Sequence, residues 1–223
     1  MVAVGGGKGG VGKSVIASNL AIAIARLGMR VTLVDADLGA ANQHTLFGIG
    51  SPGLTLQALL DKRIDSLEEA VVPTSEPRVF LVPGSGAVVG AANIGHARKM
   101  KLIRHVQSLD ADVVVVDCGA GSGFDVVDFY DMADLRFVVV TPQLTSMQNA
   151  YAFLKSAVYR AIRKAAVCHR EQELLSMAMQ GGETERLADV LARVREEDAG
   201  FADDLSRSLA SFQAHLIGNQ LEH

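Results

Sequence analysis

The chain has 223 residues, of which 49% are hydrophobic and 21% charged, and its formal net charge is −4. This composition is ordinary for a water-soluble globular protein and contains no Pro/Gly/Ser tract that would indicate disorder. A net acidic chain has no overall attraction to nucleic acid or to an anionic membrane, so either partner would need a local basic patch.

The spacing of the cysteines and the search for targeting or membrane-spanning segments narrow the class of protein further. Cys118 and Cys168 lie far apart and match no C-x-x-C pattern, which argues against a metal knuckle or a disulfide framework and favours a cytoplasmic protein. No signal peptide precedes Gly5, and no uncharged stretch reaches the roughly 18–20 residues needed to span a bilayer. Residues 221–223 resemble the start of an affinity tag, so we expect a single domain over residues 1–220.

Short apolar runs alternate with helix-length segments through residues 1–165. Continuous apolar runs predict strands that are buried on both faces, and helical periodicity between them predicts helices. This alternation indicates an α/β fold, with a mostly parallel twisted sheet and helices on both faces. The expected strands are Val2–Val4, Val31–Val34, Val79–Val82, Val113–Val116 and Phe137–Val140; the expected helices are Lys13–Leu27, Ile94–Leu109 and Ser146–Arg163.

The amino-acid composition changes between residues 168 and 212, where Glu, Arg, Leu and Ala dominate. Three segments there predict helices, with glycines between them: Arg170–Gln180, Glu183–Arg195 and Phe201–Phe212. We therefore expect a helical insertion over 168–212, followed by one more strand at Ala214–Ile217.

A glycine-rich loop follows the first expected strand. Gly7 to Ser14 satisfies G-x-x-x-x-G-K-[ST] and opens a predicted helix, which is the context that makes this pattern informative. Backbone N–H groups of such a loop surround a β-phosphate, and the helix N-terminus adds a partial positive charge. Lys13 is expected to reach the β- and γ-phosphates and Ser14 to ligate Mg²⁺, which makes ATP and Mg²⁺ the expected cofactors. The expected binding residues are Gly9, Gly10, Val11, Gly12, Lys13, Ser14 and Val15.

The second lysine of the loop is more specific. KGGVGKS, Lys8 to Ser14, resembles the deviant Walker A motif of the ParA/MinD family of ATPases, and Lys8 falls at the family's signature lysine. The resemblance, strongest to MinD- and FlhG-like members, implies the P-loop NTPase fold and a homodimer that forms with ATP. In such a dimer the signature lysine acts in trans on the partner's ATP, much as an arginine finger does. The alternative is that Lys8 is a solvated loop lysine.

Two further segments resemble the family's switch regions. VDADLGAANQH, Val34 to His44, resembles switch I, in which Asp37 matches the aspartate that orients the attacking water. Asp35 is interpreted either as a carboxylate on the Mg²⁺ side or as a structural one. VVVVDCGAGSG, Val113 to Gly123, resembles Walker B and switch II, with Asp117 reaching Mg²⁺ through water. Gly119 replaces the family's usual proline, which should loosen this loop.

The remaining signals concern adenine and possible partners. Asn219 falls where the family keeps an asparagine that hydrogen-bonds adenine, although an Asn at a strand end is often only a turn residue. Basic residues cluster in 96–105 and 159–170, and such clusters either bind DNA phosphates or form the solvated faces of helices. Membrane attachment of the MinD type needs an amphipathic C-terminal helix, and residues 1–223 contain none at that end.

These features lead to one main hypothesis and two alternatives. The main hypothesis is a slow, partner-stimulated ATP hydrolase: a Mg-ATP-dependent dimerising switch that positions or partitions a cellular cargo, with Lys8, Lys13 and Asp37 as catalytic residues. The first alternative is an iron–sulfur or metal-cluster carrier of the Mrp type, which would hold its cluster through paired cysteines. The second is an ATP-binding scaffold that does not hydrolyse ATP.

Overall fold

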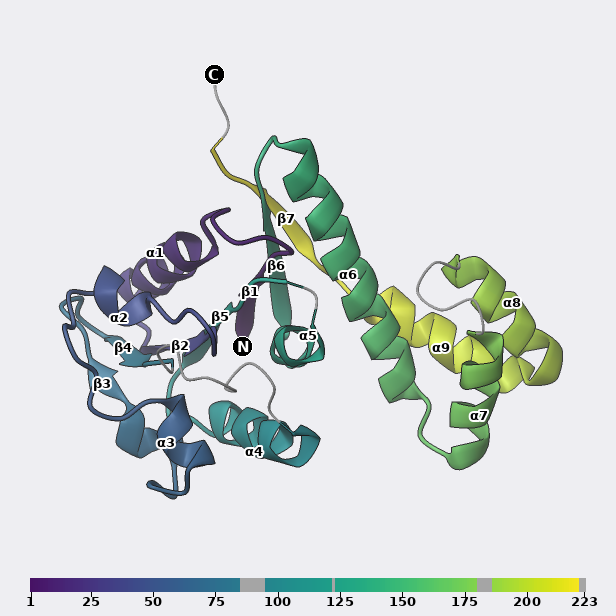
Figure 1. Ribbon diagram of the computed structural model, residues 1–223, viewed down its shortest axis with the longest axis horizontal. Helices are drawn as coiled ribbons and strands as arrows, with labels where there is room; N and C mark the ends of the chain where they lie inside the picture. The colour runs from purple at the N-terminus through teal and green to yellow at the C-terminus, as the bar shows by residue number, and fades with distance from the viewer. Residues whose placement is uncertain (85–94, 122, 180–185, 221–223) are drawn as a thin grey trace.

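The structure is a computed structural model that describes residues 1–84, 95–121, 123–179 and 186–220. Within these ranges seven strands form one sheet in the order β3-β4-β2-β5-β1-β6-β7, shown in Figure 1. Every neighbouring pair is parallel except β3 with β4, so the expected mostly parallel sheet is confirmed. The strands are β1 (Val2–Gly5), β2 (Val31–Ala36), β3 (Val72–Pro73), β4 (Val79–Val82), β5 (Val113–Cys118), β6 (Leu135–Val140) and β7 (His215–Gly218).

Two of the central strands run further than the sequence predicted. β2 continues to Ala36 and β5 to Cys118, so Asp35 and Asp117 lie inside the strands rather than after them. The parallel register pairs Asp35 directly with Asp117. The two carboxylates therefore stand side by side at the carboxyl end of the sheet, where open α/β sheets bind their ligands.

Helices cover both faces of the sheet, as expected. The alternation of side chains along the strands sends Val31 and Leu33 to one face and Val34 and Ala36 to the other. The first face packs against α1 through small residues such as Ala17, and the second packs against α3, α4, α5 and the first half of α6. The helices are α1 (Lys13–Arg26), α2 (Gln43–Leu46), α3 (Leu56–Leu60), α4 (His96–Gln107), α5 (Phe124–Asp131), α6 (Leu144–Ala165), α7 (His169–Ala178), α8 (Leu187–Glu197) and α9 (Ala199–Ser211), with the 3₁₀ turn η1 at Leu67–Ala70.

Several of these elements were not predicted. No helix or strand was predicted between residues 34 and 79 or between 116 and 137, whereas α2, α3, η1, β3 and α5 lie there. All five are eight residues long or shorter, which leaves too few turns for a periodic pattern to stand out. Helix α6 begins at Leu144, two residues before the predicted start.

The expected helical insertion is present as α7, α8 and α9, and Figure 1 shows these helices gathered beyond the far end of α6. They share an apolar cluster with the second half of α6, in which Tyr159 and Ile162 pack against Leu175, Val190 and Leu205. The predicted boundaries at 94, 180 and 183 lie outside the described residues, as does the expected tag at 221–223. Among the described helices, none is long and apolar enough to cross a membrane.

Candidate functional site

The glycine-rich loop runs from the end of β1 to the start of α1, as the sequence predicted. Gly10 has φ of 79° and Gly12 has φ of 96°, backbone conformations that side chains with a Cβ rarely adopt. Gly12 is the N-cap residue of α1, so the loop leads directly into the first backbone N–H groups of that helix. The local geometry therefore suits an anion at the helix N-terminus.

Lys13 folds back over this loop. Its side chain is buried, and its Nζ donates a hydrogen bond to the carbonyl oxygen of Lys8 at 3.2 Å. Burial raises the pKa of the neighbouring Asp117 carboxylate, and the charge of Lys13 opposes that rise. A cation is thus held at the loop, next to an acidic strand end.

Asp117 and Ser14 form the part of the site that suits a metal ion. Asp117 is 1% exposed, and its Oδ2 accepts a hydrogen bond from Gln43 Nε2 at 2.7 Å. Burial raises the pKa of Asp117, while the hydrogen bond from Gln43, the Ser14 hydroxyl and the charge of Lys13 act in the opposite direction. Asp117 Oδ1 is buried without a hydrogen-bond partner among the described residues. A buried carboxylate oxygen left unpaired beside a serine hydroxyl fits a hydrated Mg²⁺, which prefers oxygen ligands and keeps several waters.

Asp35 holds the segment that follows β2. Its Oδ2 accepts hydrogen bonds from the N–H groups of Asn42 and Gln43, both at 2.9 Å, and its Oδ1 accepts from the Asp37 N–H at 3.2 Å. Burial is the main cause that raises the pKa of Asp35 to about 7. These contacts are those of a structural carboxylate, which is one of the two interpretations open from the sequence; a role beside Mg²⁺ stays a prediction.

Asp37, in the expected switch I segment, lies next to Gly119 of the expected switch II segment. Its Oδ1 accepts hydrogen bonds from the N–H groups of Gly39 at 3.2 Å and Ala40 at 2.9 Å, which form a turn around the carboxylate. A Cβ added to Gly119 would lie 3.5 Å from this side chain, in ordinary van der Waals contact. Asp37 and its neighbours line a pocket of about 280 Å³ together with residues of the expected switch II segment and of α5: Ala36, Asp37, Leu38, Gly39, Gly119, Ala120, Gly123, Val126 and Phe129. The structure thus brings Asp37 to the switch II loop, and its action on a water stays a prediction.

The Lys8 side chain contacts the start of α6. Its Nζ lies 3.4 Å from Gln143 Oε1 and 3.3 Å from Thr145 Oγ1, at the first turn of α6. Both of these partners are neutral side chains. The two lysines of one loop therefore have separate surroundings, which is consistent with separate roles.

Asn219 contacts the loop from the opposite side. Its Nδ2 donates to the carbonyl oxygen of Val11 at 2.9 Å, and its backbone N–H donates to Val140 at 2.8 Å. A Cβ at Gly12 would lie 2.3 Å from this Nδ2, so the Asn219 amide fits only against a glycine. The structure brings Asn219 to the loop, and its contact with adenine stays a prediction.

Sequence analysis missed Gln43, which joins these parts. Gln43 is fully buried, and its Nε2 donates to the carbonyl oxygen of Ser14 at 3.0 Å as well as to Asp117. Its Oε1 accepts from Ser18 Oγ at 2.8 Å. No local signal identifies it, because a glutamine in a polar loop is normally exposed.

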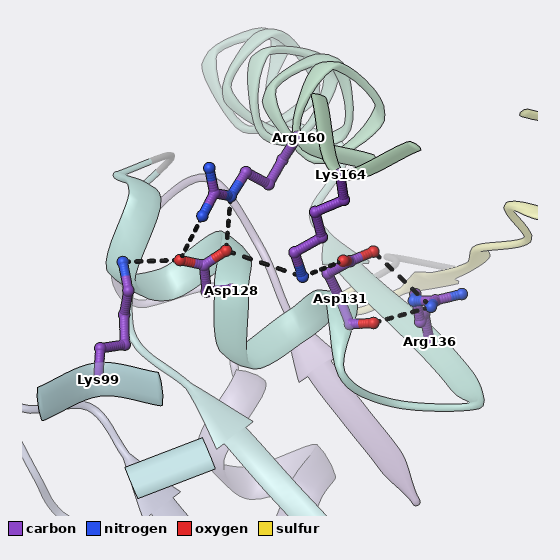
Figure 2. A network of polar contacts seen from close by, with 6 residues as sticks. All are labelled: Lys99, Asp128, Asp131, Arg136, Arg160 and Lys164. Carbon is purple, nitrogen blue, oxygen red and sulfur yellow. Dashed lines mark hydrogen bonds and ion pairs between the residues drawn. The ribbon is translucent and has the colours of Figure 1, made fainter. Parts of the chain in front are cut away.

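The helix that follows switch II is fixed by ion pairs, shown in Figure 2. Asp128 of α5 is fully buried and lies 2.6 Å from Lys99 Nζ of α4 and 2.7 Å from Arg160 Nε of α6. Asp131, one turn along α5, lies 2.5 Å from Lys164 Nζ of α6. Arg98 and Arg170 also lie 3.9 Å and 3.8 Å from a carboxylate, so at least five lysines and arginines of the two predicted basic clusters have acidic partners among the described residues, which reduces the free charge those clusters offer to DNA.

The part of the chain that contains the candidate site matches known proteins. Residues 1–162 match the protein family described as "ParA: NUBPL iron-transfer P-loop NTPase". Among curated proteins, the antiactivator FleN of Pseudomonas aeruginosa is 37% identical over 156 residues, which are 70% of this chain and 55% of FleN. The flagellum site-determining protein YlxH of Helicobacter pylori is 34% identical over 156 residues, 69% of this chain and 52% of YlxH. The chain thus spans about half the length of these two relatives.

Two solved structures share the fold of this chain. The septum site-determining protein MinD of Pyrococcus horikoshii, complexed with Mg-ADP, superposes with a TM-score of 0.61 at 19% identity, covering 93% of each chain. A chain of the MinC:MinD cell division protein complex of Aquifex aeolicus superposes with a TM-score of 0.60 at 21% identity, covering 93% of this chain and 85% of the other. At such identities the likeness concerns the fold alone.

Proposed function

The chain belongs to the ParA/NUBPL-type family of P-loop NTPases, and we propose that it is a Mg-ATP-dependent, dimerising ATPase switch that positions or partitions a cellular cargo. The observation that carries the proposal is the loop from Gly7 to Ser14, which leads into α1 near Asp117, whose Oδ1 is buried without a hydrogen-bond partner among the described residues. Relatives named for flagellar and septum placement support the class of process.

Each residue of the site would have a distinct task. The Gly9–Val15 segment presents N–H groups to the phosphates, and Lys13 compensates their charge. Ser14 and, through water, Asp117 hold Mg²⁺, which when bound neutralises charge on the phosphate oxygens. Asp37 holds the attacking water in line, and a sufficient role for it is orientation, because phosphoryl transfer demands little covalent work from the protein.

The exposed turn around Lys8 supports a site completed across a homodimer. In the part of the chain that the structure describes, Lys8 is hydrogen-bonded to the neutral side chains of Gln143 and Thr145, so its charge is available to the phosphates of a second subunit. A cation delivered in trans stabilises the transition state only when the dimer has formed, which ties hydrolysis to assembly. We expect turnover to be slow alone and to rise with an activating protein partner.

The proposal is tested with three single variants and the wild-type protein. ATP affinity, steady-state phosphate release and molecular size with ATP or ADP are measured for each. Lys13→Ala should lose ATP affinity, whereas Lys8→Ala should bind ATP and fail to hydrolyse it. Lys101→Ala, on an exposed position of α4, serves as the matched control. Unchanged affinity in Lys13→Ala, or normal hydrolysis in Lys8→Ala, would refute the mechanism.

The iron-transfer activity in the family's description defines the second candidate. It needs accessible thiolates, and of the two cysteines Cys118 is 1% exposed at the end of β5 while Cys168 is exposed before α7. Burial also raises the pKa of the Cys118 thiol, which disfavours the thiolate that binds metal. The buried thiol favours the switch, and the absorbance spectrum of anaerobically purified protein separates the two. Turnover measurements separate the switch from a scaffold that does not hydrolyse ATP.

A further inference from the structure

Gln43 is the first residue of the short helix α2. Its side chain is large and polar, lies in the centre of the site and has no exposed surface. A glutamine amide has two N–H donors and one carbonyl acceptor with two lone pairs. Each donor and the carbonyl have a partner here, as the distances to Ser14, Asp117 and Ser18 show. Burying an amide without such partners costs free energy, so the arrangement fixes the side chain in one orientation.

The contact with Asp117 divides the two oxygens of that carboxylate. Oδ2 receives the Gln43 amide at 2.7 Å, while Oδ1 is buried with no partner among the described residues. With one oxygen held, rotation of the carboxylate would break this hydrogen bond. Gln43 therefore keeps Oδ1 turned into the site, where the proposed hydrated metal ion would receive it.

The same residue is tied to the switch I segment through its backbone. The N–H of Gln43 donates to Asp35 Oδ2 at 2.9 Å, and the other oxygen of Asp35 accepts from the N–H of Asp37. Movement of residues 37–42 would thus carry the Gln43 side chain away from Asp117. The contacts link the orientation of the metal-side carboxylate to the conformation of the segment that bears Asp37.

We propose that Gln43 is a positioning residue that holds Asp117 toward Mg²⁺ and makes metal binding depend on the conformation of residues 37–43. The inference rests on the proposed nucleotide site and adds a residue that the sequence pattern did not assign. A merely structural role predicts something different: loss of stability when Gln43 is replaced, with no selective effect on the metal.

The test compares the affinity for fluorescent ADP with Mg²⁺ and with EDTA. Gln43→Met keeps the volume and removes both donors, so affinity in EDTA should stay at the wild-type value. The gain in affinity from Mg²⁺ should fall about tenfold, since partners that orient metal ligands commonly matter by about 10–100-fold. Gln43→Asn, one methylene shorter and still polar, should lose the same gain and replaces the Met variant if that one does not fold.

Ser18→Ala is the matched control. It removes the hydrogen bond to Gln43 Oε1 and leaves both amide donors in place. This variant should lose stability and keep the full Mg²⁺ gain. The inference is overturned if Gln43→Met retains the gain, or if Ser18→Ala loses as much as Gln43→Met. If the wild-type protein binds fluorescent ADP neither with Mg²⁺ nor with EDTA, the proposed nucleotide site is refuted; if it binds ADP equally well in both, the inference about Gln43 is refuted.

Discussion

Replacing Asp128 by asparagine tests how much the buried ion pairs of α5 contribute to stability. Asp128→Asn preserves the shape of the side chain and removes its charge. The ammonium of Lys99, which lies 2.6 Å from the carboxylate and is 4% exposed, would then lie buried beside a neutral amide. Arg160 would lose the carboxylate that accepts its two hydrogen bonds at 2.7 and 3.2 Å. Figure 2 shows both cations converging on this one side chain.

The expected loss follows from this burial. Removing one partner of a buried pair costs about 3–5 kcal/mol, because the charge that stays behind loses the carboxylate it was buried against. For a domain of this size each kcal/mol lowers Tm by roughly 2–4 °C, so the expected decrease is about 6–20 °C. Urea denaturation followed by circular dichroism, with a thermal scan, measures both quantities.

An exposed pair provides the control. Arg195 lies 2.6 Å from Asp203, and both side chains are more than half exposed. Such pairs contribute about 0–1 kcal/mol, so Asp203→Asn should scarcely change unfolding. If Asp128→Asn changed stability as little as Asp203→Asn, the reasoning from burial would be refuted.

The stabilisation of the fold by Asp128 should depend on pH and decrease on acidification. Burial acts to raise the pKa of Asp128, but the hydrogen bonds and charges of Arg160 and Lys99 outweigh it, and the pKa lies below its ordinary value of 3.8. A lowered carboxylate pKa stabilises the fold above 3.8, and this stabilisation is lost as the pH falls through the folded-state pKa. The difference between wild type and Asp128→Asn should therefore be full at neutral pH and shrink below 3.8. A difference that grew on acidification would contradict the assignment.

Two further predictions concern packing at the glycine-rich loop and at Tyr130. Gly7→Ala would place a Cβ 1.9 Å from the carbonyl oxygen of Asn149, so this variant should lose about 1–3 kcal/mol of unfolding free energy and the loop should be displaced. Gly9→Ala is the control and should be tolerated, because a Cβ there would meet nothing within 4 Å. Equal unfolding free energies for the two variants would count against the close approach at Gly7. Tyr130→Phe removes a fully buried hydroxyl that has no hydrogen-bond partner among the described residues, so the variant should be as stable as wild type or up to about 1–3 kcal/mol more stable in the same urea titration. A clear loss of stability would show that the hydroxyl has a partner.

Features that depend on neighbouring residues were predictable. The continuous apolar runs predicted the central strands because a parallel strand is buried on both faces over its whole length. Gly7 to Ser14 predicted a strand–loop–helix unit, and β1 and α1 flank it as expected. Both signals lie within fewer than about fifteen residues, so one stretch of chain carries them completely.

Features that depend on distant partners were not predictable. Gln43 and Asp117 are 74 residues apart, and only the pairing of β2 with β5 brings them together. Lys99 and Arg160 looked like parts of solvated or DNA-binding helix faces until the packing of α4 and α6 on α5 gave them Asp128 as a common partner. A charge or an amide acquires its role from the groups it is buried against. The local sequence therefore predicted the P-loop NTPase fold, and the packing of its elements decided which polar side chains contact one another at the carboxyl end of the sheet.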